Sequence, residues 1–314
     1  MSKMRAAIID PNASGYVAIG EVDYPTPTLN EAIVKVAATS LNQGEVRYAQ
    51  SQEPGTQIGW DLAGIIEQAA TDGSGPKLGT RVVGFVRTGA WAEFVAVPTN
   101  ALAQLPDNVS FAQAATLPVA GLTALYVLEK GNGLLDRNVL ITGANGGVGL
   151  FSCKLAHLMG AHPVALVRRE QYMELVSSHG AEHVVISEDG ETASKFGPYR
   201  LISESVGGSV LTNSLGMLAP DGICVTFGAS ADPEVTFNVW TFMRSARVSM
   251  YGFLLFHELG NEPASVGLKR LVNMVSRGEL EPYITVEEHW SKVGEVARDL
   301  WDRKIPGKAV ICMG

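Results

Sequence analysis

The fold is decided by one stretch, which reads Val139-Leu140-Ile141-Thr142-Gly143-Ala144-Asn145-Gly146-Gly147-Val148-Gly149. Its first four residues are apolar or β-branched and predict a buried strand. The glycines predict a tight turn, and the apolar residues of 150–159 recur at helical spacing, which predicts a helix. A strand, a glycine turn and a helix in this order direct backbone N–H groups and the positive end of the helix dipole toward an anion.

The turn has the spacing of a dinucleotide-binding motif. Ala144, Gly146 and Gly149 stand at the three glycine positions of G-x-G-x-x-G, with alanine at the first. Gly146 would let the backbone approach a pyrophosphate, and Gly149 would let the helix pack close to the strand. The spacing alone is weak evidence, because many glycine turns bind nothing. The strand before the turn, the helix after it and a further strand expected at 163–167 supply the context that favours dinucleotide binding.

Composition sets limits on the class of protein. The 314 residues are enough for about two domains, and a net charge of −8 argues against nucleic acid as a partner. No apolar run approaches the roughly 20 residues that cross a bilayer, so no membrane partner is expected. The start runs into strand-like sequence without a visible signal peptide, and three scattered cysteines cannot build a disulfide framework. A cytoplasmic location is therefore expected.

The pattern of elements changes near Ser110. Before it, short strands broken by Gly and Pro predict a small barrel-like domain, with 41–59 irregular. After it, strands and helices alternate, which predicts a parallel, doubly wound sheet. The strands of the barrel-like part are expected at 5–10, 16–21, 31–40, 61–68, 81–86 and 90–97. Those of the sheet are expected at 139–142, 163–167, 183–186, 200–204, 222–227 and 247–252, with helices at 147–159, 170–178, 207–217 and 263–277. The tail, with strands near 283–287 and 308–312 around a helix at 292–303, is expected to return to the first domain.

The end of the second strand of this sheet bears on the choice of dinucleotide. An NAD-type fold places an acidic residue about 20 positions past the glycine turn, where it holds the ribose 2′-hydroxyl. Here Arg168 and Arg169 occupy that region, and a 2′-phosphate suits their planar, bidentate guanidinium groups. The alternative is that both arginines are solvated surface charges, and the neighbouring Glu170 weighs against the phosphate. NADPH is favoured over NADH.

Five local motifs follow one another along the chain in an order that is typical of a known superfamily. They read Gly59-Trp60-Asp61-Leu62-Ala63-Gly64, Gly121-Leu122-Thr123-Ala124, Gly143–Gly149, Ser205-Val206-Gly207-Gly208 and Phe227-Gly228-Ala229-Ser230. The whole chain resembles the medium-chain dehydrogenase/reductase superfamily, and within it the zinc-free quinone oxidoreductase (zeta-crystallin-like) branch. This resemblance implies an α/β fold, with a GroES-like β-rich catalytic domain over 1–113, completed by 279–314, and a Rossmann NADP-binding domain over 114–278. It also implies a cofactor in the cleft between the two domains.

The resemblance also implies site residues. Asn42 corresponds to the family asparagine beside the nicotinamide, and Tyr48 stands near, but not at, the place of a family tyrosine. Glu204 stands where the family has aspartate. The end of the apolar stretch 251–256 is expected to line the nicotinamide pocket, and Phe253 within the stretch is expected to contact the cofactor. The stretch also reads as a buried final strand. Besides Asn42, the expected cofactor contacts are Thr123, Ala144, Asn145, Gly146, Gly147, Val148, Arg168, Arg169, Val206, Phe227, Gly228, Ala229, Ser230 and Phe253.

No metal is expected. Metal-dependent relatives need ligands at the positions that Asn42 and Trp60 hold here, and neither residue type is a usual zinc ligand. The six histidines show no paired ligand spacing. A simple alcohol or ketone is then a poor substrate, because no metal polarises its oxygen.

The expected function is NADPH-dependent reduction of quinones or other α,β-unsaturated carbonyl compounds by hydride transfer, with Asn42 or Tyr48 as hydrogen-bond donor. Reduction of an enoyl thioester or a haloacrylate is an alternative within the same class. A non-enzymatic, crystallin-like or RNA-associated nucleotide-binding protein is the alternative from another class. A homodimer is expected, paired through the last strand of the sheet at 248–253.

Overall fold

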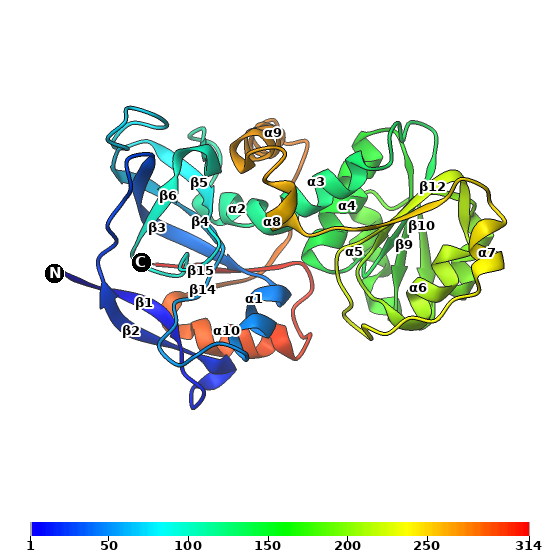
Figure 1. Cartoon of the computed structure of the whole chain (residues 1–314), viewed down its shortest axis with the longest axis horizontal. Helices are drawn as coiled ribbons and strands as arrows, with labels where there is room; N and C mark the ends of the chain where they lie inside the picture. Colours follow the sequence, from blue (N-terminus) through cyan, green and yellow to red (C-terminus); the bar gives the residue numbers. More distant parts are fainter. Residues whose placement is uncertain (1, 314) are drawn as a thin grey trace. The chain divides into compact units, whose positions relative to one another are not determined.

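The computed structural model describes residues 2–313, and these form two compact units. The first unit runs through Leu122 and resumes at Leu259, and the second is Thr123–Glu258 (Figure 1). The sequence-based boundaries lie at 113/114 and 278/279 instead. The difference at the second boundary arises at α9 (Ala264–Ser276), which packs against β7 (Leu102–Gln104) of the first unit. The side chain of Asn108 also donates to the carbonyl of Ser276 at 2.8 Å.

The second unit is built on a six-stranded sheet, as predicted. Every strand pairing in this sheet is parallel, and the strand order is β10-β9-β8-β11-β12-β13. This is the order 3-2-1-4-5-6 of the Rossmann fold. The strands are β8 (Asn138–Thr142), β9 (His162–Val167), β10 (His183–Ile186), β11 (Tyr199–Glu204), β12 (Leu218–Thr226) and β13 (Ser249–Gly252).

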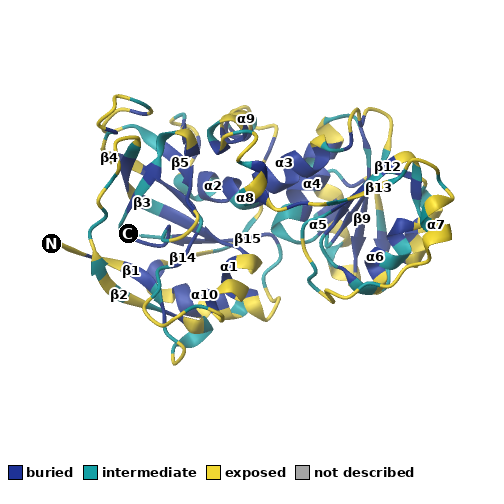
Figure 2. Ribbon diagram, viewed as in Figure 1, coloured by how far each residue is buried: buried dark blue, intermediate teal, exposed yellow. Residues whose placement is uncertain are grey.

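Helices alternate with the strands of this sheet along the chain, and apolar side chains form its core. The helices are α3 (Leu122–Glu129), α4 (Gly147–Leu158), α5 (Met173–Ser178), α6 (Gly208–Leu215), α7 (Val239–Met243) and α8 (Leu255–Glu258). Leu140, Ile202 and Cys224 lie on the three central strands and are fully buried. Figure 2 shows α7, by contrast, as exposed. Buried on both faces, such strands read as the nearly continuous apolar runs seen in the sequence.

The first unit contains a seven-stranded sheet and a separate two-stranded one, which agrees with the β-rich domain predicted. The larger sheet has the order β14-β15-β3-β4-β5-β7, and β6 pairs with β3. β15 lies antiparallel to β3, so the prediction that the tail returns to the first domain is confirmed. The strands are β1 (Lys3–Ile9), β2 (Val17–Asp23), β3 (Glu31–Leu41), β4 (Asp61–Gln68), β5 (Arg81–Phe85), β6 (Phe94–Pro98), β7, β14 (Ile284–His289) and β15 (Lys308–Cys312). The helices are α1 (Gln43–Ala49), α2 (Phe111–Ala115), α9 and α10 (Val293–Trp301).

One local prediction was wrong. The stretch 41–59 was expected to be irregular, but α1 spans Gln43–Ala49 within it. Asn42 is the N-cap of this helix, and Glu45 at the third helical position accepts the backbone N–H of Asn42 at 2.7 Å. This is a capping box, which satisfies N–H groups that the first helical turn leaves unpaired. Within residues 2–313, no helix combines the length and the apolar character that a membrane crossing requires.

Candidate active site

The carboxyl ends of the second unit's strands lie along one edge of the sheet, because all six strands run parallel. The turns that follow these ends bring most of the predicted cofactor residues together. The N–H of Phe253, just after β13, donates to the carbonyl of Thr226 at the end of β12 at 2.8 Å. Residues at this edge are Ala144–Val148 after β8, Arg168 and Arg169 after β9, Val206 after β11, Phe227–Ser230 after β12 and Phe253 after β13. Thr123 is instead buried near the start of α3.

The glycine turn has the close packing that its spacing predicts. Gly143 has a φ of 59°, in the left-handed region that glycine favours. A Cβ on Gly149 would lie 2.6 Å from the Cα of Ala144, so a side chain there would push α4 away from the turn. Gly146 is the N-cap of the 12-residue α4, whose first N–H groups lack helical partners. The backbone of this turn fits a pyrophosphate at the helix N-terminus.

Glu204 joins the turns that follow three of the strands. The side chain is fully buried at the end of β11. Its Oε1 accepts the backbone N–H groups of Val206 at 2.7 Å and Gly207 at 2.9 Å. The hydroxyls of Thr142 on β8 and Thr226 on β12 lie 3.4 and 3.3 Å from its carboxylate oxygens. Burial raises the pKa of Glu204, and these hydrogen bonds oppose that shift.

Arg168 and Arg169, which are expected to bind a 2′-phosphate on the ribose, are both exposed. Arg168 and Arg169 directly follow β9, whose last residue, Val167, accepts the N–H of Ser187 at 3.1 Å. Two solvent-exposed guanidinium groups, which are able to bind a phosphate in a bidentate manner, therefore lie at the carboxyl edge of the sheet. The second unit thus has the glycine turn and the two arginines at the same edge of its sheet.

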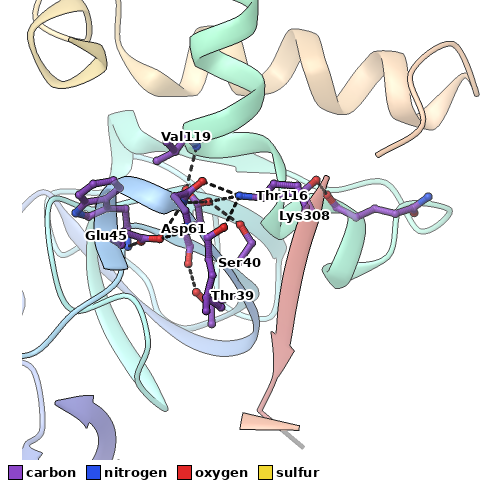
Figure 3. Close-up of polar contacts among 11 residues, drawn as sticks. Thr39, Ser40, Glu45, Asp61, Thr116, Val119 and Lys308 are labelled. Carbon is purple, nitrogen blue, oxygen red and sulfur yellow. Dashed lines mark hydrogen bonds and ion pairs between the residues drawn. The ribbon is translucent and has the colours of Figure 1, made fainter. Parts of the chain in front are cut away.

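The first unit contains a buried cluster of charged and polar side chains that centres on Asp61 (Figure 3). Asp61 is the first residue of β4 and is fully buried. Its Oδ2 accepts hydrogen bonds from Ser40 Oγ at 2.7 Å and from Asn42 Nδ2 at 2.8 Å. Its Oδ1 accepts the backbone N–H of Val119 at 2.9 Å. Every one of these partners donates to the carboxylate.

Asn42 has its amide group fully engaged inside this cluster. Nδ2 donates to Glu45 Oε2 at 2.9 Å as well as to Asp61, and Oδ1 accepts from Lys308 Nζ at 2.6 Å. Both amide hydrogens are therefore used within the protein. The donor role toward substrate that the sequence suggested for Asn42 would require one of these bonds to break.

Glu45 and Lys308 complete the cluster. Glu45 Oε1 accepts the backbone N–H of Trp60 at 2.5 Å, and Lys308 Nζ donates to the carbonyl of Leu41 at 2.9 Å. Burial, together with the charge of Asp61, raises the pKa of Glu45 well above its usual range. Burial lowers the pKa of Lys308, and the two carboxylates oppose that shift. Three ionisable side chains, those of Glu45, Asp61 and Lys308, are thus buried next to one another.

Unlike Asn42 and Glu45, Tyr48 is 49% exposed on α1. Trp60 lies against the start of the same helix, where a Cβ on Gly44 would come within 3.0 Å of its ring. Tyr48 therefore presents a phenol to solvent from a helix whose N-terminus is tied to the buried cluster.

The sequence interpretation included Asn42 and Tyr48 in the site but missed the roles of Glu45, Asp61 and Lys308. The Asn-x-x-Glu spacing at 42–45 is a capping-box pattern and could have indicated both the helix and Glu45. Lys308 lies 266 residues from Asn42, and no local pattern relates the two. Among residues 2–313, no group of three or more His, Cys, Asp or Glu side chains is arranged to hold a metal.

Comparison with known proteins agrees with this organisation. Residues 28–107 match the family described as alcohol dehydrogenase GroES-like domain, and residues 147–268 match the family described as zinc-binding dehydrogenase. The chloroplast envelope quinone oxidoreductase homolog of Arabidopsis thaliana is 30% identical over 92% of this chain and 90% of its own length. The human mitochondrial NAD(P)H oxidoreductase RTN4IP1 is 31% identical over 68% of this chain and 59% of its own length.

Solved structures show the same fold. The quinone oxidoreductase from Coxiella burnetii superposes with a TM-score of 0.86 over the whole of both chains, at 22% identity. A mycobacterial protein complexed with NADPH superposes with a TM-score of 0.88 over 99% of this chain and all of its own, at 23% identity. The chain belongs to the medium-chain dehydrogenase/reductase superfamily. Within that superfamily it falls in the quinone oxidoreductase-like branch, so the family predicted from the motifs is confirmed.

Proposed function

We propose that this protein is an NADPH-dependent oxidoreductase that reduces quinones or other α,β-unsaturated carbonyl compounds by hydride transfer. The observation that carries the cofactor choice is the exposed pair Arg168 and Arg169 at the carboxyl edge of the Rossmann sheet, next to the glycine turn after β8. Relatives named as NAD(P)H oxidoreductases and quinone oxidoreductase homologs support the same class of reaction.

The residues of the second unit would hold the cofactor. Backbone N–H groups of Asn145, Gly147 and Val148 would hold the pyrophosphate, since those of Ala144 and Gly146 donate to the carbonyls of Leu166 and Gly143. Arg168 with Arg169 would pair with the 2′-phosphate. Val206, Phe227–Ser230, Thr123 and Phe253 complete the expected contacts. NADPH supplies the hydride, and the protein supplies orientation and exclusion of water.

The residues of the first unit would serve the acceptor. A conjugated carbonyl delocalises the incoming negative charge onto its own oxygen, so one hydrogen-bond donor can stabilise it without a metal. Tyr48 is the better candidate for this donor, because its phenol is exposed while the amide hydrogens of Asn42 are used inside the protein. We assign Asn42 to the same site, where its role is to cap the helix that bears Tyr48.

One panel of assays tests the proposal. Purified protein is given NADPH with a simple quinone, an enone, an enal and a haloacrylate, and oxidation of NADPH is followed by its absorbance. We expect turnover with the quinone or the enone. The control is NADP⁺ with a simple secondary alcohol, for which we expect no reaction. Turnover of the alcohol, or no oxidation of NADPH with any acceptor, would overturn the proposal.

Reduction of an enoyl thioester is the second candidate. Two fungal relatives named as trans-enoyl reductases match at 30–31% identity over 62–63% of this chain. A crotonyl thioester added to the same panel distinguishes this reaction from quinone reduction. A protein that binds NADPH yet reduces none of these acceptors would instead fit the non-enzymatic alternative.

We also propose a homodimer that forms through β13. This strand is an edge of the Rossmann sheet, since it pairs with β12 alone in the part of the chain described here. Ser249 and Met250 on the strand are exposed, as are Val239 and Trp240 on α7. The cytoplasmic location stays a prediction, and two of the relatives carry names that place them in the chloroplast envelope and in mitochondria.

A further inference from the structure

We propose that Glu45 and Lys308 are positioning residues that act through Asn42 on α1 and thereby set where Tyr48 lies. This inference rests on the proposed function, in which Tyr48 serves the acceptor. Glu45 is fully buried and Lys308 nearly so, and therefore we assign both an indirect role without contact to the substrate.

Lys308 holds the point at which β3 becomes α1. Its Nζ donates to the carbonyl of Leu41, the last residue of β3, and to Oδ1 of Asn42, the N-cap of α1. Lys308 is itself the first residue of β15, which pairs antiparallel with β3. The ammonium therefore ties two adjacent residues of the junction to a neighbouring strand of the sheet.

Glu45 holds the same junction from the helix side. Its Oε2 accepts both the backbone N–H and the side-chain Nδ2 of Asn42, and its Oε1 accepts the backbone N–H of Trp60. All three groups are donors, and a neutral glutamine would have to turn an NH₂ group toward at least one of them. The site thus requires an acceptor at both oxygens of Glu45.

The reason that α1 depends on these contacts is its length. It spans only seven residues, and isolated helices shorter than about 12–15 residues are marginal in water. Tyr48 is 49% exposed, so packing covers only about half of its surface. Loosening the first turn would therefore displace the phenol, and a misplacement of about 1 Å can cost about 100-fold in rate.

The central variant is Glu45→Gln, with Glu53→Gln as its matched control, since Glu53 is exposed just beyond α1. In hydrogen exchange with mass spectrometry, we expect faster exchange of peptides covering 43–49 in Glu45→Gln and no change in Glu53→Gln. Peptides of the Rossmann sheet should exchange as in the wild type. Unchanged exchange at 43–49, or a loss of protection spread over the whole first unit, would overturn the proposal. This measurement does not depend on activity, so it remains decisive if the wild type reduces no acceptor and the proposed function itself fails.

Kinetics separate positioning from general stability. We expect Glu45→Gln to lower kcat for the quinone at least about tenfold, with the Kd for NADPH within about twofold of the wild type. Glu45→Asp, which keeps a carboxyl group, should recover part of the loss. In a Tyr48→Phe background, Glu45→Gln should cause little further loss, because both changes remove the same contribution. Losses that multiply would mean that Glu45 does not act through Tyr48, and the proposal would be wrong.

Lys308 is tested from the other side of the junction. Lys308→Met removes the ammonium while leaving a side chain of similar length, and we expect it to raise exchange at 43–49 as Glu45→Gln does. If Lys308→Met does not fold, Lys308→Arg keeps the positive charge and tests the geometry alone. Equal exchange at 43–49 in the wild type and in whichever variant folds would exclude Lys308 from the positioning role.

Discussion

The carboxylate of Glu204 accepts the backbone N–H of Gly207 at 2.9 Å, and this contact fixes the turn that follows β11. The same oxygen accepts the N–H of Val206, and Thr226 on the neighbouring strand lies 3.3 Å from the other oxygen. A buried carboxylate whose partners are all donors tolerates replacement poorly, since each donor left unsatisfied costs about 1–3 kcal/mol. Glu204 thus holds turns of the predicted cofactor site without pointing into solvent.

We expect Glu204→Gln to weaken NADPH binding about tenfold and to lower the melting temperature. The carboxylate accepts hydrogen bonds at both of its oxygens, whereas the glutamine amide has one oxygen and would turn an NH₂ group toward the partners of the other. Fluorescence titration with NADPH measures the affinity, and calorimetry measures the melting temperature. The control is Glu191→Gln, an exposed glutamate in the same unit. An unchanged affinity in Glu204→Gln would show that these turns hold their shape without the carboxylate.

Arg168 is predicted to set the cofactor preference. The wild type should bind NADPH at least about tenfold more tightly than NADH, which corresponds to about 1.4 kcal/mol. Arg168→Asp should abolish or reverse this ratio, because a carboxylate repels the 2′-phosphate and accepts from a 2′-hydroxyl. Arg137→Asp is the control, since Arg137 is exposed just before β8 and so lies at the opposite edge of the sheet. Equal affinities of the wild type for the two nucleotides would refute the assignment.

The protein should work without zinc, although the family that matches residues 147–268 is described as zinc-binding. Asn42 and Trp60 stand at the two positions where metal-dependent relatives are expected to supply ligands, and Asn42 is already engaged with Lys308 at 2.6 Å. Elemental analysis of untagged protein should find well below one equivalent of zinc, and a chelator should leave turnover unchanged. Stoichiometric zinc whose removal abolishes activity would contradict this prediction.

We expect the free energy of unfolding to decrease at acid pH because of Glu258. Lys130 Nζ lies 2.8 Å from its carboxylate, and the hydroxyl of Tyr251 donates to it as well. Burial alone would raise the pKa of Glu258, but these hydrogen bonds outweigh burial and lower it below 4.5. A carboxylate with a lowered pKa in the folded state stabilises the protein above the unfolded value, and that contribution is lost as the pH falls through the folded pKa.

We therefore expect Glu258→Gln to destabilise the protein by about 1.5–3 kcal/mol at neutral pH, the range for hydrogen bonds to charged groups. The difference in melting temperature between wild type and variant should shrink as the pH falls below 4.5. Thermal unfolding measured over a series of pH values checks both statements. A difference that stays constant into the acid range would mean that the ionised form of Glu258 is not what stabilises the fold.

The sequence predicts a structural feature well where the residues that form it lie close together along the chain, and poorly where they lie far apart. The Rossmann sheet follows from local patterns, because its inner strands are apolar runs and the helices expected after β8, β9 and β11 are present as α4, α5 and α6. The crossover from β12 to β13 is the exception, since no helix is expected from the sequence where α7 lies. Even the strand at 183–186 was predicted with the observed bounds. The glycine turn is local as well, and its role in packing was evident from the spacing of Ala144, Gly146 and Gly149.

The buried cluster could be predicted only in part. Asn42 and Glu45 form a local capping box that the sequence contains, whereas Asp61 and Lys308 come from other strands of the sheet. Their meeting depends on the antiparallel pairing of β3 with β4 and β15, which no local pattern specifies. Asn42 was for this reason read as a free donor, while the structure shows its amide engaged with three side chains.

The last prediction concerns β13 as an interface between two copies of the chain. This edge strand carries the exposed residues Ser249 and Met250, and an uncovered edge is prone to pair with another strand. Pairing about a two-fold axis covers both edges at once, so light scattering should give twice the chain mass of 33.4 kDa. Met250→Lys should give monomers, because a charged side chain disfavours pairing at an edge, and Met250→Pro should give monomers or aggregates. Leu158→Lys, at an exposed leucine that ends α4, controls for a general effect of the added charge. A wild-type mass of one chain, or a dimer that survives Met250→Lys, would place the interface elsewhere or remove it.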